Sequence, residues 1–142
     1  MNLPQRALED VKVNVKLKLA TLWVSFMFLY IYVDYFHLYM SGSIEDILAG
    51  KVFVFDITQV FLLVALTFVI IPALMIFLSI ALSPKVNRRT NIIVAAVNIP
   101  YMLFNLAGEA WMHMVLGALV EVVLLLLIIS YAWRWPKQEA RT

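Results

Sequence analysis

The chain has 142 residues, no cysteine, a formal net charge of +2 and 64% hydrophobic residues. The absence of cysteine excludes disulfides, thiolate metal sites and thiol catalysis, and the small charge without a basic stripe argues against nucleic acid as a partner. Soluble domains contain only ~45–50% apolar residues, and a chain this short would leave the excess exposed to water, so we expect an integral membrane protein.

The sequence contains four long apolar segments, and about 20 residues are needed to cross the ~30 Å hydrocarbon layer of a bilayer. We therefore predict an all-α fold, an integral membrane four-helix transmembrane bundle. The third segment is the shortest and carries Asn98, Pro100 and Asn105. The predicted transmembrane domain covers residues 19–135, with spans at 19–40, 57–82, 92–106 and 111–133.

Lysine and arginine gather on one side of this predicted topology. Ten of the eleven lie in the N-terminal arm, the second loop or the tail, whereas Lys51 alone lies in the first loop. Because cytoplasmic loops are enriched in Lys and Arg, we predict that both termini are cytoplasmic. Four crossings return the chain to the side on which it started, so the two predictions agree.

The segments outside the spans also carry patterns. Residues 1–18 form a predicted cytoplasmic arm in which residues 11–18 alternate apolar and polar as a strand does, although Leu8, Val11 and Val15 also fit helical spacing. We favour an amphipathic helix on the membrane surface, or an extension of the first span, with its lysines near anionic headgroups. Residues 136–142 form the predicted cytoplasmic tail.

The first outer loop and the ends of the second span contain turn and capping signals. Ser43 followed by Asp46 predicts a short helix that Gly50 would end, and we interpret it as a folded connector rather than a lid. Asp56 followed by Gln59 resembles a capping box at the start of the second span. Pro84 is expected to end that span, because proline disfavours the helical conformation at the residue before it.

Glu121 falls near the middle of the fourth predicted span. An ionised carboxylate at that depth is strongly penalised unless it is paired or hydrated. Asn98, near the middle of the third span, is the candidate partner, and Gly117 and Ala118 would let a neighbouring helix approach closely. Two interpretations stay open: a carboxylate that couples to a proton or cation, and a protonated structural Glu hydrogen-bonded between helices.

Asp34 and His37 lie three residues apart in the first span, and therefore on one face of the helix. Gln59, Asn105 and His113 are expected at a similar depth on the other three helices. The sequence thus predicts an intramembrane polar cluster that opens outward. Such a cluster would act either as a binding site or as a hydrogen-bonded network that fixes helix packing.

No metal site or cofactor is predicted. Histidine, aspartate and glutamate are admissible metal ligands, but His37 and His113 lie on different helices and the sequence has no Glu-x-x-His motif of the di-iron kind. A phosphate-binding glycine loop and a nucleophilic serine elbow are also absent from the sequence. An enzyme is therefore the less favoured class.

Short motifs along nearly the whole chain stand out as a set. They are Lys16-Leu17-Lys18-Leu19, Tyr30-Ile31-Tyr32-Val33-Asp34-Tyr35-Phe36, Thr58-Gln59, Ile71-Pro72, Phe77-Leu78-Ser79, Asn87-Arg88, Val120-Glu121-Val122 and Tyr131-Ala132-Trp133-Arg134-Trp135-Pro136. With these motifs the chain resembles a family of small bacterial four-span membrane proteins of unknown function. The resemblance implies the four-helix architecture and the bacterial inner membrane as location, and it implies no activity, substrate or cofactor. Asp34, Gln59 and Glu121 lie on resembling segments.

Three functions compete at this point. The favoured one is an accessory or scaffold protein that acts through helix–helix association, with the lipid bilayer and either a second copy or another membrane protein as partners. The second is a small proton-coupled transporter or carrier that uses Glu121 and the outward cluster of Asp34 and His37. The third is a membrane-embedded enzyme acting on a lipid or a quinone.

Overall fold

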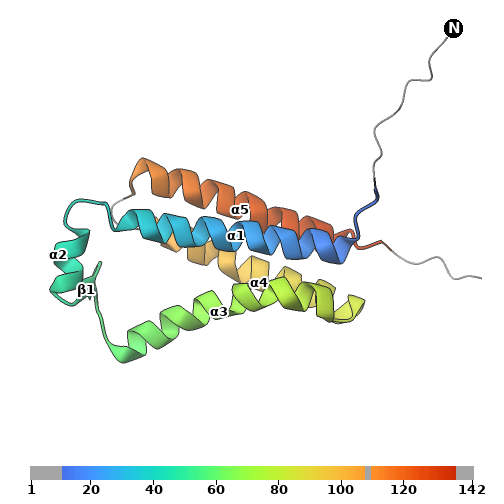
Figure 1. Cartoon of the computed structure of the whole chain (residues 1–142), viewed down its shortest axis with the longest axis horizontal. Coiled ribbons are helices and arrows are strands. Elements are labelled where there is room, and N and C mark those ends of the chain that lie inside the picture. The colour runs from blue at the N-terminus through green and yellow to red at the C-terminus, as the bar shows by residue number, and fades with distance from the viewer. Residues whose placement is uncertain (1–10, 108–109, 137–142) are drawn as a thin grey trace, which may run out of the picture.

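A computed structural model of the protein describes residues 11–107 and 110–136. Four long helices pack along one another, and a short helix with a two-stranded hairpin closes one end (Figure 1). The elements in chain order are α1 (Val15–His37), α2 (Ser43–Leu48), β1 (Lys51–Val52), β2 (Phe55–Asp56), α3 (Gln59–Ala81), α4 (Pro84–Phe104) and α5 (Met112–Trp133).

The two ends of the molecule differ in how tightly the helices pack. We call the end that carries α2 and the hairpin the outer end, and the opposite end, where α1 begins and α5 stops, the inner end. Helix α1 packs on α5 and on α3, and α4 packs on α5, whereas α3 and α4 touch over a shorter length. In Figure 1, α3 diverges from α1 toward the outer end. The buried residues of α3 accordingly lie in its second half, at Pro72, Met75 and Ser79.

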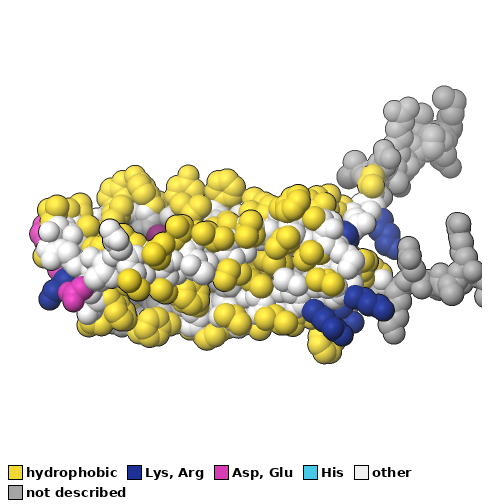
Figure 2. All heavy atoms as spheres, turned by 90° about the horizontal axis from the view of Figure 1, so that it is seen from below, with side chains coloured by type: hydrophobic (Ala, Val, Ile, Leu, Met, Phe, Trp, Pro, Cys, Tyr) yellow, Lys and Arg dark blue, Asp and Glu magenta, His cyan; other side chains and the backbone are white. Residues whose placement is uncertain are grey.

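Three of the helices, α1, α3 and α5, are long and apolar enough to cross a membrane. Apolar side chains cover the long sides of the face shown in Figure 2, and most of the Lys and Arg visible there lie at the inner end. These features support a helical membrane protein. Helix α4 is more polar and does not meet the same criterion, so crossing by all four helices and the cytoplasmic location of both termini stay predictions.

Helix α1 begins earlier than the predicted first span. The side chain of Asn14 accepts a hydrogen bond from the backbone N–H of Lys16 at 2.9 Å and so caps the helix at Val15. Residues 15–18 of the predicted arm therefore extend the first span, while residues 11–14 have no regular secondary structure. The remainder of the arm, residues 1–10, lies outside the described residues, as do residues 137–142 of the tail.

The start of α3 differs from the predicted capping box. Thr58 is the N-cap, and its hydroxyl accepts a hydrogen bond from the backbone N–H of Phe61 at 3.1 Å. Asp56 instead lies in β2 and pairs with Lys51 of β1. The capping role predicted for Asp56 is wrong because the strand pairing holds it in extended backbone, two residues before the N-cap residue Thr58.

Helix α4 is longer than the predicted third span. It starts at Pro84, with Ser83 as its N-cap residue, because proline is favoured in the first turn, where its missing N–H is not needed. Only Leu82 and Ser83 separate α3 from α4. The basic segment assigned to a loop, Lys85 to Arg89, therefore forms the first turns of α4.

The predicted short helix of the outer loop is present as α2. It follows Gly42, whose φ is 87°, and it is followed by Gly50, whose φ is 78°, and such backbone conformations favour glycine. The hairpin after it was not predicted. Its turn places Phe53 at a φ of 54°, a position that an Asn-Gly pair would have signalled and a phenylalanine does not.

Candidate functional site

Glu121 lies on the buried face of α5, where only 3% of its surface is exposed. Its Oε1 atom is buried and has no hydrogen-bond partner among the described residues. A buried polar atom without a partner is costly, and packed structures rarely contain one without a reason. The side chain therefore marks a point in the bundle that packing alone does not explain.

Asp34 and Tyr30 lie on α1 within electrostatic reach of this carboxyl group. Both carboxyl groups act electrostatically on the Tyr30 hydroxyl, and the Asp34 carboxyl acts on that of Glu121. The hydroxyls of Tyr30 and Tyr101 are 3.2 Å apart, which joins α1 to α4. We call Asp34, Glu121, Tyr30 and Tyr101 the carboxyl–tyrosine cluster.

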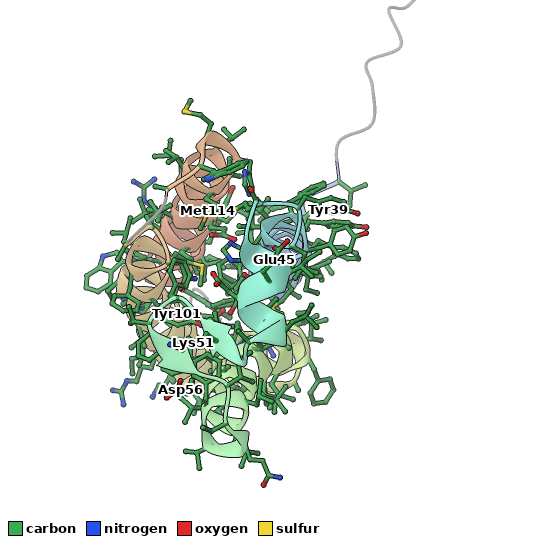
Figure 3. All side chains as sticks on the ribbon, turned by 90° about the vertical axis from the view of Figure 1, so that its left-hand side faces the viewer. Tyr39, Glu45, Lys51, Asp56, Tyr101 and Met114 are labelled. Atoms are coloured by element: carbon green, nitrogen blue, oxygen red, sulfur yellow. The ribbon has the colours of Figure 1, made fainter. Side chains whose placement is uncertain are left out.

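The carboxyl–tyrosine cluster lies between the helices in the outer half of the molecule. Figure 3 looks into the outer end and shows Tyr101 and several side-chain oxygen atoms gathered between the helix axes. The Tyr101 ring stacks on Phe68 of α3, with ring centroids 4.7 Å apart, so α3 supports the cluster from the side. Three helices supply the polar groups and a fourth supplies an apolar wall.

One carboxyl group of the cluster is accessible. Asp34 is exposed, unlike Glu121, and lies in the half of α1 from which α3 diverges (Figure 1). Figure 2, which views the molecule from the side of α3, shows an acidic side chain recessed among apolar ones in the outer half. The arrangement therefore joins an accessible carboxyl group to an enclosed one.

Asn98 does not pair with Glu121 as predicted. Its side-chain amide donates to the backbone carbonyl of Val94 at 2.8 Å, one turn earlier on the same helix. Asparagine readily forms such local bonds to the i−4 carbonyl. Glu121 Oε1 receives no hydrogen bond from Asn98 or from any other described residue, so this pair does not link α4 to α5.

Gln59 lies apart from the carboxyl–tyrosine cluster. It is exposed at the start of α3 and lines a groove with Leu62, Leu63 and Leu66 of the same helix. Gln59 was predicted to lie at a depth similar to that of Asp34 and His37. It lies outside the cluster because α3 diverges from the other helices at its first turns, where Gln59 is located (Figure 1).

The remaining predicted residues lie around the outer end. The His37 ring packs on Phe53 of the hairpin, with centroids 5.6 Å apart. The His113 ring lies 6.2 Å from that of Trp111, and its Nε2 atom is buried without a hydrogen-bond partner among the described residues. Asn105 is the C-cap residue of α4. Over the described part of the chain, no three His, Asp or Glu side chains gather as metal ligands would.

A second polar group, in the inner half, was missed by the sequence interpretation. The Trp23 indole N–H and the Ser79 hydroxyl both donate to Asn91 Oδ1, at 2.7 and 3.2 Å. The Asn91 amide donates to Asn87 Oδ1 at 2.6 Å, and the Asn87 amide donates to the carbonyl of Ser79 at 2.6 Å. We call these four residues the asparagine network.

The asparagine network ties together α1, α3 and α4. All four residues are fully buried, so the Trp23 indole lies in the core of the bundle. The four-residue spacing of Asn87 and Asn91, with Asn98 two turns further on, was the signal that could have revealed a polar inward face on α4. Because these polar groups bond to one another inside the bundle, the network is structural.

The comparisons with known proteins bear on the whole chain. The profile of a family of unknown function (DUF6326) matches residues 8–142. The chain belongs to this family. The match includes every segment on which the resemblance rested. It also includes all four residues of the carboxyl–tyrosine cluster, so the cluster lies within the DUF6326 region. No curated protein and no solved structure matches the chain, so its function has to be argued from its site.

Proposed function

We propose that the protein binds and releases a proton, or a small cation in its place, at Asp34 and Glu121 and acts as a proton-coupled carrier in the membrane. The observation that carries this proposal is the buried Glu121 Oε1 atom, which lacks a hydrogen-bond partner among the described residues while a second carboxyl group lies within electrostatic reach.

The bonding of the neighbouring groups supports a functional carboxyl over a structural one. A glutamate that pins two helices together needs a hydrogen bond across the interface. The nearest predicted donor, Asn98, is bonded to Val94 of its own helix. Two ionised carboxylates close together repel each other, and a bound proton or cation removes that repulsion. Reversible occupancy is thus the chemistry that the pair can perform.

The route to Glu121 also supports the proposal. Asp34 is exposed in the outer half of α1, so it is the group that a proton entering from the outer end would meet first. The bonded hydroxyls of Tyr30 and Tyr101 lie beside the carboxyl groups. Hydroxyls donate and accept in turn, and they can therefore pass a proton between groups that do not touch.

An infrared titration of the protein in lipid tests the proposal. We expect the carboxylic acid band to change with pH in the wild type, with separate parts of the change removed by Glu121→Gln and Asp34→Asn. Glu45→Gln is the matched control, because Glu45 is an exposed acid at the same end on α2. A Glu121 band that never titrates while the protein remains folded would mean a permanently protonated structural residue and would refute the proposal.

A flux assay extends the test from binding to transport. Vesicles loaded with a pH-sensitive dye, with potassium and valinomycin to balance charge, report proton entry. The wild type should equilibrate an imposed pH gradient faster than protein-free vesicles. Both carboxyl variants should fall to the protein-free rate, and Glu45→Gln should keep the wild-type rate. Equal rates in the wild type and in Glu121→Gln would contradict proton movement through this site.

We propose self-association as a second candidate function, because α3 is the most apolar helix and only 11% of its most apolar window is buried inside the chain. A second copy packed on the outer half of α3 would cover the exposed apolar side chains of this helix. The chain has no cysteine, so Leu63→Cys provides a unique thiol for cross-linking. Leu119→Cys on α5 is the control, since Leu119 and Leu63 are similarly exposed, at 61% and 65%. Equal cross-linking of the two variants would contradict an α3 interface.

A further inference from the structure

A basic cavity lies at the inner end, away from the carboxyl–tyrosine cluster. It has a volume of about 430 Å³ and lies between α4 and α5. Helix α4 contributes three cations and one apolar residue, and α5 contributes an indole ring. The lining residues are Lys85, Arg88, Arg89, Ile92 and Trp133.

The three cations point the same way because of their spacing. Lys85, Arg88 and Arg89 are related by three and four residues, and they therefore share one face of α4. The first turn of α4 carries no acidic residue, and its backbone N–H groups add partial positive charge at this end. Figure 2 shows Lys and Arg side chains gathered at the inner end. The cavity is thus a concentrated positive site.

Trp133 distinguishes this cavity from an ordinary basic loop. The Arg88 guanidinium carbon lies 5.3 Å from the centroid of the Trp133 ring, a cation–π contact that holds the arginine at the cavity wall. Tryptophan is typical of the headgroup level of a membrane, and Trp133 is 66% exposed at the end of α5. Ile92 adds an apolar surface one turn deeper along α4.

We propose that this cavity binds the phosphate group of an anionic phospholipid. Arginine forms paired hydrogen bonds to phosphate oxygens, lysine adds a further charge, and Ile92 with Trp133 contacts the apolar part of the lipid below the phosphate. Basic pockets between membrane helices bind anionic headgroups in this way. A free phosphate would share the charge contacts but would gain nothing from the apolar residues.

A lipid titration with charge-matched variants tests the site. The full chain in a neutral detergent is titrated with phosphatidylglycerol, phosphatidylcholine or inorganic phosphate, and binding is followed by native mass spectrometry. We expect saturable binding of phosphatidylglycerol and none of the other two. The double variant Lys85→Gln and Arg89→Gln removes two exposed charges that line the cavity. Each lost charge contact should raise the Kd for phosphatidylglycerol about fivefold, and the two together should raise it about 30-fold.

The matched control removes two charges of the same end that do not line the cavity, with Lys18→Gln and Arg134→Gln. Lys18 lies over the ring of Tyr131 instead. For this control double variant we expect the Kd for phosphatidylglycerol to change less than about 5-fold, which is the change expected from losing one surface charge contact. Equal weakening by the two double variants would mean diffuse attraction and would overturn the site. Binding of phosphatidylcholine, or equal binding of inorganic phosphate, would overturn its assignment to an anionic lipid.

The thermal midpoint of each variant without lipid shows whether it folds. If the cavity double variant does not fold, Lys85→Gln alone and Lys18→Gln alone replace the two doubles, with an expected change in Kd of about fivefold for Lys85→Gln. An unchanged Kd for Lys85→Gln would overturn the proposal.

Discussion

A methyl group added at Gly117 tests the closest contact between α1 and α5. A Cβ atom built on Gly117 would lie 2.5 Å from Val33 Cγ2, 3.5 Å from Cγ1 and 3.6 Å from Cβ. Carbon atoms in contact prefer about 3.5–4.0 Å, so the shortest distance is too short by about 1 Å. Valine in a helix has one strongly preferred χ1 rotamer, and the Val33 methyl group therefore cannot swing aside at low cost.

The sign of the change in the free energy of unfolding caused by Gly117→Ala shows whether α1 and α5 are in close contact at this position. Without a clash, alanine should raise the free energy of unfolding by up to about 1 kcal/mol, because it is the better helix former. Overpacking of a tight contact costs about 1–3 kcal/mol. We therefore expect a net loss of about 1 kcal/mol, measured by unfolding in detergent with circular dichroism.

The variant Val33→Ala provides the control for this prediction. It removes both methyl groups that a Cβ at position 117 would meet, so Gly117→Ala in that background should stabilise the protein instead of destabilising it. The sign reversal is a coupling that a double-mutant cycle measures directly. If Gly117→Ala stabilises the protein in both backgrounds, α1 and α5 do not approach as closely as described.

Three further substitutions test the polar contacts of the bundle. Asn91→Leu should lower the free energy of unfolding by about 3 kcal/mol, because Trp23 and its other buried partners lose their acceptor or donor. Lys16→Met should cost about 1–2 kcal/mol, because the Lys16 ammonium donates to the carbonyls of Ile80 and Leu82 at 3.0 and 2.7 Å. Tyr101→Phe should cost about 1 kcal/mol, because it removes the hydroxyl bonded to Tyr30.

The free energies of unfolding of these three variants are measured in the same way as for Gly117→Ala, and each variant is compared with a second substitution. Trp23→Phe should cost less in the Asn91→Leu background than in the wild type, and equal costs would contradict the bond between them. Lys12→Met, at an exposed position before α1, should leave stability unchanged where Lys16→Met lowers it. Tyr30→Phe should add little to Tyr101→Phe, because the two hydroxyls share one bond, and full additivity would contradict this.

The apolar helices α1, α3 and α5 were predictable from the sequence. The more polar helix α4 was predictable only in part. The apolar runs of α1, α3 and α5 leave no alternative to a helix in lipid. The first turns of α4 were assigned to a loop because Lys85, Arg88 and Arg89 looked like a topology signal. The same turns carry Asn87 and Asn91, which hydropathy counts as unfavourable although they bond inside the bundle.

Both carboxyl groups of the candidate site, Glu121 and Asp34, were predicted from the sequence, but their common location was not. Glu121 was placed inside the bundle because a carboxyl group cannot face lipid freely, and it is buried. Its surroundings depend on how each helix is rotated and on where α3 diverges, and residue spacing along one helix does not encode either. Tyr101 was therefore not predicted as a member of the cluster, whereas Gln59 was predicted there and lies outside it.

The short connection between α3 and α4 has a consequence for how the protein enters a membrane. Helix α4 carries three asparagines on its buried face. If α4 partitioned into lipid by itself, their side-chain amides would lack hydrogen-bond partners on other helices. With only Leu82 and Ser83 between them, α3 and α4 form a helical hairpin, and Asn87 reaches Ser79 across the bend. On the predicted four-span topology, the strongly apolar α3 would carry its polar neighbour across in one insertion event, so weakening α3 should impair biogenesis of both helices together.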